Sequence, residues 1–393
     1  MPFLLAIASV SCACCLLVAP APDAAALAPA LTAYRDGDYA RALRLVRPLA
    51  ERGNAEAQSL MGDCLYAPAA LERDVAQAAT WYRRAAEQGM VHAQLNLAAL
   101  LFTGDEDLQP NLPEALHWYR ILADKGYRNA QTATGTMLWM GVDGGVPKPE
   151  EGAQWFRKAA EQGDLEAMLN LARGYERGPV LEHDDVQATH WYLQMALRGY
   201  APAQNHVGRK YLEGVGVAKD EERAFHWFSR AADNGDAEGQ LNLGRCYLEG
   251  IGTVQSNQAG VTWIMRAVDQ QNTEAMLELA ELLTEGRVLK RDDRQALVLN
   301  AYAGILGETQ GVVRAAEALV EGRGVPLNRA RAFATYRVAL KMADATESAA
   351  IEKKLNQLEA QLSDDERRQV DEYRRQWERL KQKGEKPAIG DLV

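Results

Sequence analysis

The chain has 393 residues, 47% of them hydrophobic and 25% charged, a composition typical of a folded protein and unlike that of a disordered chain. Its formal net charge of −10 argues against a nucleic-acid partner, because binding to phosphates needs a basic surface. Length alone would suggest two or three globular domains, but an internal repeat overrides that expectation.

The first 26 residues are expected to be an export signal. Residues 3–18 form an apolar run, and small residues with an Ala-x-Ala motif at 24–26 follow it. No Lys or Arg precedes the run, and a short buried helix is the alternative. Three early cysteines leave a lipoprotein anchor open, although none has a Leu three residues before it: Cys12, Cys14 and Cys15. We expect an exported, periplasmic protein, and no later stretch is apolar enough to predict a membrane span.

Six tryptophans recur at nearly constant spacing after this segment. They are separated by 37, 37, 36, 36 and 36 residues, and the surrounding pattern extends without the Trp to Leu45, Leu299 and Thr335. We call these residues anchors and count positions within each repeat from them. The tryptophan anchors are Trp81, Trp118, Trp155, Trp191, Trp227 and Trp263.

Each repeat predicts two antiparallel helices. Small residues three before and four after the anchor share its helix face, which lets neighbouring helices approach closely. A Gly at position +8 supplies the left-handed cap that ends this helix, and a second helix follows. One pair cannot bury its own apolar face, so successive pairs must stack in a solenoid. Position +8 holds Gly after seven of the first eight anchors: Gly53, Gly89, Gly126, Gly163, Gly199, Gly235 and Gly307, with Gln271 as the exception.

Two further helices are expected after the repeats. The first spans about residues 346–361, and the second opens with a capping box at 363–366 and carries an apolar stripe. They are predicted to cap the solenoid, with a protruding coiled coil as the alternative. The stripe consists of Val370, Tyr373, Trp377 and Leu380.

The repeat pattern resembles Sel1-like repeats, which are relatives of tetratricopeptide repeats. Residues 155–178, WFRKAAEQGDLEAMLNLARGYERG, match the family pattern almost position by position, and the resemblance covers about residues 33–343. It implies an all-α, right-handed α-solenoid of about nine antiparallel helix pairs with a concave groove. Members are non-catalytic adaptors, and several bacterial ones are exported. A cysteine-rich branch has one disulfide per repeat, but this chain lacks those cysteines.

The predicted organisation has five parts along the chain. They are an export signal (1–26), a tetratricopeptide-like helix pair (27–53), the repeat solenoid (54–343), capping helices (344–384) and a flexible tail (385–393). Only Cys64 and Cys246 lie beyond the signal, five repeats apart. Stacked helix layers about 8–10 Å apart would hold their sulfurs too far apart for a disulfide, so we expect two free thiols.

No catalytic or metal-binding pattern stands out. The six histidines lack a Cys or carboxylate at ligand spacing on one helix face, so neither a metal nor a cofactor is expected. Acidic clusters such as KRDD (290–293) recur where helices begin and are expected to be caps. The glycine-rich segments recur in every repeat as turns, so the sequence does not predict an enzyme.

The groove is the better candidate for a site. Positions +15 and +18 lie on the helix after the +8 Gly, which is the first helix of each stacked pair and is expected to line the groove. This puts Arg173, Arg209 and Arg245 in a row that we call the arginine ladder. One turn before them lie Asn170, His206 and Asn242. Such a row could hold a carboxylate-bearing chain by bidentate contacts. The alternative is that each Arg pairs with a nearby carboxylate: Glu176, Glu213 or Glu249.

Trp139 lies outside the anchor series and is a second candidate. An exposed ring there would be a typical interface anchor, whereas the alternative is that it packs under the loop at 141–151.

Together these features predict a non-catalytic scaffold of the bacterial cell envelope that binds a partner protein or acidic peptide in the groove. An envelope component that contacts an anionic polysaccharide during exopolysaccharide assembly or export is the alternative. A cell-wall hydrolase is disfavoured, because about 50 residues of charged C-terminal sequence cannot hold a catalytic domain.

Overall fold

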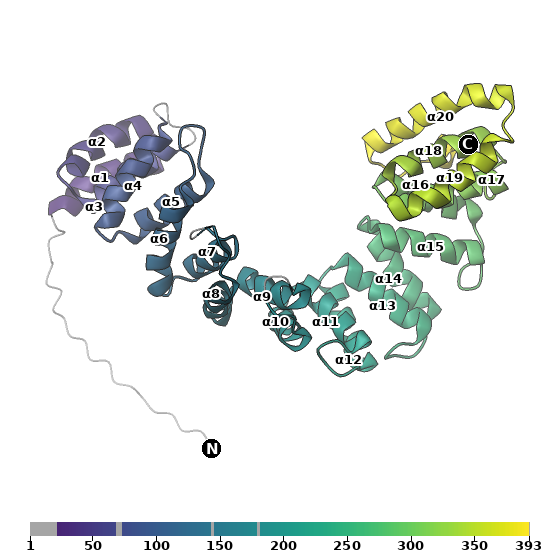
Figure 1. The fold of residues 1–393 in the computed structure, drawn as a ribbon, viewed down its shortest axis with the longest axis horizontal. Helices are drawn as coiled ribbons and strands as arrows, with labels where there is room; N and C mark the ends of the chain where they lie inside the picture. Colours follow the sequence, from purple (N-terminus) through teal and green to yellow (C-terminus); the bar gives the residue numbers. More distant parts are fainter. Residues whose placement is uncertain (1–21, 68–72, 143–144, 179–180, 393) are drawn as a thin grey trace, which may run out of the picture. The chain divides into compact units, whose positions relative to one another are not determined.

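The computed structural model describes residues 22–67, 73–142, 145–178 and 181–392, in which every regular element is a helix (Figure 1). The predicted export signal therefore lies almost wholly outside the described residues. Contacts divide the chain into two compact units, residues 1–171 and 172–393, with the boundary inside one helix. None of the described helices is long and apolar enough to cross a membrane.

The first unit is a series of antiparallel helix pairs. Each of its first eight helices packs most heavily on one of its two neighbours along the chain, as the short connections require. The helices are α1 (Pro22–Arg35), α2 (Tyr39–Glu51), α3 (Ala55–Tyr66), α4 (Val75–Glu87), α5 (Val91–Thr103), α6 (Leu112–Asp124), α7 (Arg128–Trp139) and α8 (Pro149–Glu161), and the boundary between units falls inside α9 (Leu165–Arg177).

The second unit continues the same arrangement and ends in a cap. Its paired helices are α10 (Asp185–Leu197), α11 (Ala201–Glu213), α12 (Glu221–Asp233), α13 (Ala237–Glu249), α14 (Asn257–Asp269), α15 (Thr273–Glu285), α16 (Asp293–Ile305), α17 (Thr309–Glu321) and α18 (Arg329–Met342). The described residues thus contain nine consecutive pairs, α1/α2 to α17/α18, which confirms the predicted α-solenoid architecture.

An aromatic ring fixes the spacing inside most pairs. Position +1 carries the ring, and position +17 of the preceding first helix is Gly or Ala because nothing larger fits beneath it. A Cβ on Gly208 would stand 2.6 Å from Phe228 Cδ1, and one on Gly135 would stand 2.9 Å from Phe156 Cε1. The small and large residues are therefore one packing device, repeated along the chain.

The predicted caps are present at both helix ends. All seven glycines at position +8 have a positive φ, and Gln271 adopts the same conformation with φ of 62°. At helix starts the Asp74 and Asp292 side chains accept hydrogen bonds from the backbone N–H groups of Gln77 and Gln295. The acidic clusters are therefore caps, as expected.

The two expected C-terminal helices are present and pack on the last pair. They are α19 (Ala345–Glu359) and α20 (Asp364–Lys383), and Ser363 forms the predicted capping box with Glu366. Val370 and Trp377 of α20 are buried, and α20 packs against α18, so these helices cap the repeats and do not protrude as a coiled coil.

The tail differs from expectation. Residues 385–393 were predicted to be flexible, but they contain the short helix α21 (Ile389–Leu392). Leu392 is 5% exposed and joins the hydrophobic core of the second unit, because α21 contacts α16.

Both remaining cysteines are buried and free, as predicted. Burial raises the pKa of Cys64 and that of Cys246 to about 12. The thiols are therefore protonated at neutral pH and unreactive in the folded chain.

Candidate binding face on the first helices of the repeats

The candidate site of the second unit lies on the first helix of each pair. The first helices α11 and α13 contact one another directly, and ion pairs join α9 to α11 and α13 to α15, so the outward positions of these helices form one surface. We call the surface formed by positions +11, +15 and +18 of these helices the first-helix face.

Charged contacts on this face follow a fixed rule between repeats. Position +18 of one repeat meets positions +11 and +15 of the next. Arg245 Nη2 lies 2.8 Å from Glu274 Oε1, and its Nε lies 2.6 Å from Glu278 Oε2. Arg209 Nη1 lies 3.1 Å from Glu238 Oε1.

The first unit uses the same positions, with an acidic residue at +18. Asp63 is at position +18, and its Oδ1 lies 3.1 Å from His92 Nε2 and 3.2 Å from Asn96 Nδ2, at +11 and +15 of the next repeat. The Tyr82 hydroxyl also donates to Asp63, at 2.8 Å. These side chains line a cavity of about 460 Å³ that the sequence did not indicate.

Two members of the arginine ladder are therefore already paired. Their partners are carboxylates of the following repeat, and the sequence-based alternative of Glu213 and Glu249 on the same helices does not describe them. The reason is geometric, because the first turn of the next first helix lies beside the last turns of the preceding one. Asn242 is also engaged, since its amide donates to Asn205 Oδ1 at 2.8 Å.

Arg173 is the exception in the ladder. The next repeat has Pro202 and His206 at positions +11 and +15, so the carboxylates that face Arg209 and Arg245 are missing there. Arg173 is exposed, and among the described residues it has no hydrogen bond or ion pair. The same holds for Arg177, one helical turn later on α9.

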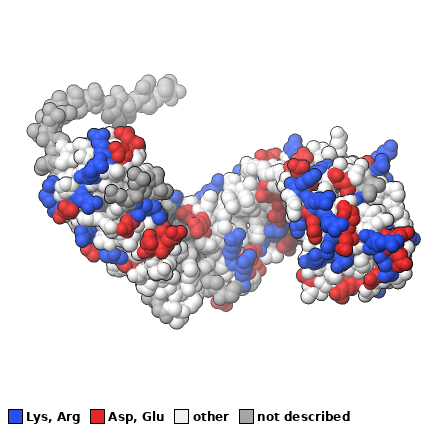
Figure 2. All heavy atoms as spheres, turned by 90° about the horizontal axis from the view of Figure 1, so that it is seen from above, with Lys and Arg blue, Asp and Glu red and all other residues white. Residues whose placement is uncertain are grey.

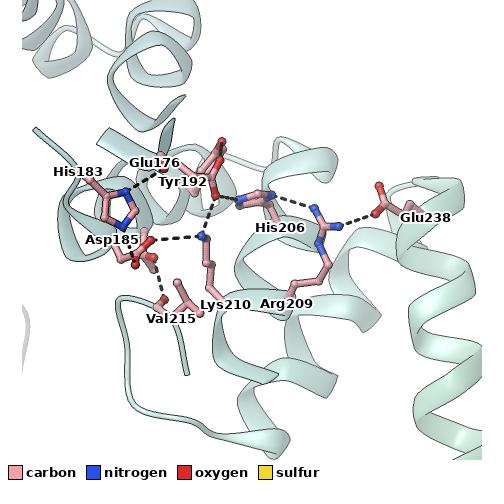
Figure 3. A network of polar contacts seen from close by, with 10 residues as sticks. Glu176, His183, Asp185, Tyr192, His206, Arg209, Lys210, Val215 and Glu238 are labelled. Carbon is pink, nitrogen blue, oxygen red and sulfur yellow. Dashed lines mark hydrogen bonds and ion pairs between the residues drawn. The ribbon is translucent and has the colours of Figure 1, made fainter. Parts of the chain in front are cut away.

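Glu176 lies between these two arginines in the sequence, but its carboxylate contacts Lys210, His206 and Tyr192 instead (Figure 3). Its carboxylate accepts hydrogen bonds from Lys210 Nζ at 2.7 Å, from His206 Nε2 at 3.0 Å and from the Tyr192 hydroxyl at 3.0 Å. Burial opposes its ionisation, but the hydrogen bond from Lys210 and the contacts with His206 outweigh burial and lower the pKa of Glu176 to about 2. Glu176 is therefore an anion at neutral pH whose charge is used inside the network.

His206 is held as a neutral ring by its two neighbours. An arginine can only donate, so Arg209 Nη2, 3.1 Å from His206 Nδ1, requires that Nδ1 accepts. The proton is then on Nε2 and is donated to Glu176. Burial lowers the pKa of His206, despite the opposing charge of Glu176, which agrees with the neutral form. The predicted site residue His206 thus orients Arg209 and Glu176 and is not free to bind.

Lys210 of α11 completes the network by contacting both Glu176 and Asp185. It is only 7% exposed, and its Nζ lies 2.7 Å from Glu176 Oε1 and 3.9 Å from Asp185 Oδ1. Asp185 in turn contacts His183 Nε2 at 3.2 Å (Figure 3). A buried lysine needs such compensation, and the network that supplies it joins α9, α10 and α11. Arg173 and Arg177 stay exposed, without a counter-ion among the residues that the structure describes.

The other predicted residues lie elsewhere. Asn170 is half-buried on the part of α9 that belongs to the first unit, so it is described apart from the ladder. Trp139 is half-buried against its own repeat: its Nε1 donates to Pro149 O at 2.8 Å, and its ring meets Phe156 edge-on at 4.8 Å. The expectation of an exposed ring is thus corrected in favour of packing, because Gly152 leaves room for the indole.

The second unit also contains a cavity, and the repeat pattern explains its origin. Position +1 of this repeat holds Asn300 in place of an aromatic residue, opposite Ala280 at position +17. A cavity of about 180 Å³ remains there, lined by both residues. Asn300 is 7% exposed, and its Oδ1 has no hydrogen-bond partner among the described residues.

No group of three or more His, Cys, Asp or Glu side chains within the described ranges is arranged to hold a metal ion.

The paired helices, their 36-residue period and the polar first-helix face together define an α-solenoid built from helix-pair repeats.

Seven consecutive matches to the Sel1 repeat cover residues 55–299, so the chain belongs to the Sel1 repeat family. The matched segments are 55–90, 91–127, 128–164, 165–200, 201–236, 237–272 and 273–299. The last pair, α17/α18, continues the fold beyond them. Sel1 repeats are generally protein-interaction scaffolds, and no catalytic family is indicated.

Solved structures agree with this assignment. The chain is similar to a Sel1 repeat protein from Oxalobacter formigenes, with 25% identity and a TM-score of 0.70 over 84% of this chain and 94% of that one. It is also similar to c5321, a protective antigen present in uropathogenic Escherichia coli strains, with 29% identity and a TM-score of 0.64 over 87% and 71%. No curated protein matches the sequence.

Proposed function

We propose that this Sel1 repeat protein is a non-catalytic scaffold of the bacterial cell envelope that binds an acidic segment of a partner protein on the first-helix face. The observation that carries the proposal is the exposed Arg173, whose counter-ion positions in the next repeat are taken by Pro202 and His206. With Arg177 one turn away, α9 presents two guanidinium groups without a carboxylate partner among the described residues.

Two adjacent guanidinium groups suit a peptide with spaced carboxylates. A guanidinium binds a carboxylate through two parallel hydrogen bonds, which gives direction as well as charge. Each exposed pair is worth only about 0–1 kcal/mol, so affinity requires several contacts along the face. Arg209 and Arg245 could add contacts by exchange, because the side chains of their partners Glu238 and Glu274 are 46% and 60% exposed.

The envelope location rests on two supporting observations. The predicted cut after residue 26 would fall inside α1 and just before Leu27, so the buried Leu27 and Ala30 would stay in the mature chain. The similar E. coli protein is described as a protective antigen, and this description supports the proposal of an exported protein. Fractionation of cells that express the chain with and without residues 1–26 tests this part, and retention of both forms in the cytoplasm would refute it.

Binding is tested by fluorescence anisotropy with a labelled peptide rich in Glu. Arg173→Glu combined with Arg177→Glu should weaken peptide binding by at least about tenfold, the equivalent of about 1.4 kcal/mol. Arg198→Glu is the matched control, because Arg198 is the exposed C-cap residue of α10 and its side chain bonds only to Gln194, one turn before it. Equal affinity of the double variant and the wild type would overturn the proposed face.

An anionic polysaccharide carries the same carboxylate group on sugar rings. Polygalacturonate is therefore included as a second ligand at matched charge. Tighter binding of this polymer than of the peptide, lost in the double variant, would replace the peptide with a polysaccharide as the partner. Substituting Arg209 or Arg245 is avoided, because their removal would leave Glu238, Glu274 and Glu278 unpaired.

A further inference from the structure

The C-terminal cap contains a pocket that the scaffold function does not use. It has a volume of about 400 Å³ and lies where α18, α20 and α21 meet. The face turned to the viewer in Figure 2 carries many Lys and Arg side chains over this end of the second unit, with Asp and Glu between them. The pocket is lined by Arg331, Tyr373, Gln376, Arg379, Leu380, Lys383, Gly390 and Asp391.

Arg331 is the unusual member of this set. It is 8% exposed, and its guanidinium lies over the Tyr373 ring, 4.7 Å from the centroid. Its Nη2 donates to Gln376 Oε1, but its Nη1 is buried and has no hydrogen-bond partner among the described residues. No carboxylate of the described chain comes within ion-pair distance of Arg331.

A buried cation without a counter-ion is costly. Removing a guanidinium from water costs several kcal/mol, and neither a neutral amide nor an aromatic face repays that in full. Burial lowers the pKa of Arg331, which shows the same penalty, although the group stays charged at neutral pH. Either a group outside the described residues supplies a negative charge to Arg331, or the desolvation penalty lowers the stability of the folded chain.

The other charges of the pocket point to the same kind of partner. Arg379 and Lys383 lie one turn apart on α20, and neither forms an ion pair within the described residues. Asp391 of α21 is the only acidic residue in the lining; it is exposed and attracts Arg331 from beyond ion-pair distance. The lining thus has three cations against one anion.

We propose that this pocket binds a small anionic group, a phosphate or a carboxylate, with Arg331 at its base and Arg379 and Lys383 at its rim. The anion takes the place of the counter-ion that Arg331 lacks, and two guanidinium groups and an ammonium surround it. Asp391 opposes the anion from the α21 side. The site is separate from the first-helix face and does not depend on the proposed scaffold role.

The test measures the thermal unfolding of the full chain against millimolar inorganic phosphate, at pH 7 and constant ionic strength maintained with NaCl. Because the anion binds the folded chain alone, the midpoint should rise and then follow the logarithm of concentration. A parallel titration with citrate, compared at equal charge, separates a preference for phosphate from one for carboxylate. Absence of any rise with both anions would overturn the site.

Variants on exposed positions make the test independent of folding. Arg379→Ala combined with Lys383→Ala should raise the Kd for the anion by about tenfold or more. Asp391→Asn should lower it several-fold, because it removes the only opposing charge in the lining. Arg375→Ala is the matched control on the same helix, since Arg375 is paired with Glu372, and it should leave the Kd unchanged.

Arg331→Met tests the base of the pocket. Methionine fills similar space without charge, so the variant should lose the anion-dependent rise while its midpoint without anion stays the same or increases. An anion response that survives in Arg331→Met, or that is equal in the Arg379/Lys383 double variant and the wild type, would show that the anion binds elsewhere.

Discussion

Gly62 lies directly beneath the ring of Tyr82, so closely that a Cβ on Gly62 would stand 2.6 Å from Tyr82 Cδ1. Gly62 is on α3 and Tyr82 on α4, and the Tyr82 hydroxyl bonds to Asp63, the residue next to Gly62. The contact therefore joins the packing of the pair to the polar side chains of the first-helix face.

Gly62→Ala should destabilise the first unit. The added methyl must displace the Tyr82 ring, at a cost of about 1–3 kcal/mol for overpacking, while the better helix propensity of Ala returns at most about 1 kcal/mol. Urea unfolding followed by circular dichroism measures the difference. A gain in stability, which propensity alone would give, would show that the ring moves without cost.

Gln271→Gly should stabilise the second unit. Gln271 has a φ of 62°, in a region that costs a residue with a side chain about 1–2 kcal/mol and costs Gly almost nothing. We expect a gain of about 1 kcal/mol in the free energy of unfolding, by urea titration. The matched control is the reverse exchange Gly235→Gln, at the same position of the preceding repeat, which should lose a similar amount.

The Glu176 network makes stability depend on acid pH. The pKa of Glu176 is about 2 in the folded chain, below its ordinary value of 4.5, so folding favours the ionised form. Its contribution is complete above about pH 4.5 and falls as the pH drops towards 2, by at most about 3 kcal/mol. Urea unfolding of the wild type and Glu176→Gln between pH 3 and 6 measures this, and the difference between them should shrink as pH falls.

The difference in the free energy of unfolding between the wild type and Glu176→Gln at neutral pH has a second cause. Glu176→Gln leaves the buried Lys210 without its closest anion, which costs about 3–5 kcal/mol in comparable pairs. Lys210→Met in the same background should recover part of the loss, because no buried charge then remains at Nζ. A pH-independent difference between wild type and Glu176→Gln would contradict the depressed pKa.

Asn300→Phe should fill the cavity above Ala280. The substitution restores the aromatic side chain found at this position in most other repeats, and it removes an amide whose oxygen has no partner among the described residues. We expect a gain of about 0.5–2 kcal/mol, measured by the thermal midpoint. The converse variant Phe156→Asn should lose about 3–5 kcal/mol, and a loss with Asn300→Phe would mean that the cavity is narrower than its volume suggests.

The repeat made most of the fold predictable. The period, the helix pairs, the caps and even the exceptional Gln271 follow from positions that recur, since each repeat is an independent observation of the same local structure. The cap helices followed from Ser363 and an apolar stripe. The docking of Leu392 did not, because a single apolar residue in a charged segment gives no periodic signal.

The site was predictable only in part. Positions +15 and +18 were correctly placed on one helix face, but the partners of Arg209 and Arg245 lie one repeat further along the chain. That contact depends on the offset between neighbouring first helices, which a single helix does not encode. The sequence nevertheless contained a signal for these pairs. A Glu stands at +11 of the repeat that follows Arg209 and of the repeat that follows Arg245, but not of the repeat that follows Arg173.

This offset gives the order of the repeats a meaning. Excision of residues 201–236 would bring the repeat that begins at 237 against α9, and Glu238 would then face Arg173 in place of Pro202. The guanidinium offered to a partner would be neutralised without any change to its own repeat. Loss of one repeat would therefore remove a binding site from the neighbouring repeat. The order of the repeats, and not only the sequence of each one, thus determines what the protein can bind.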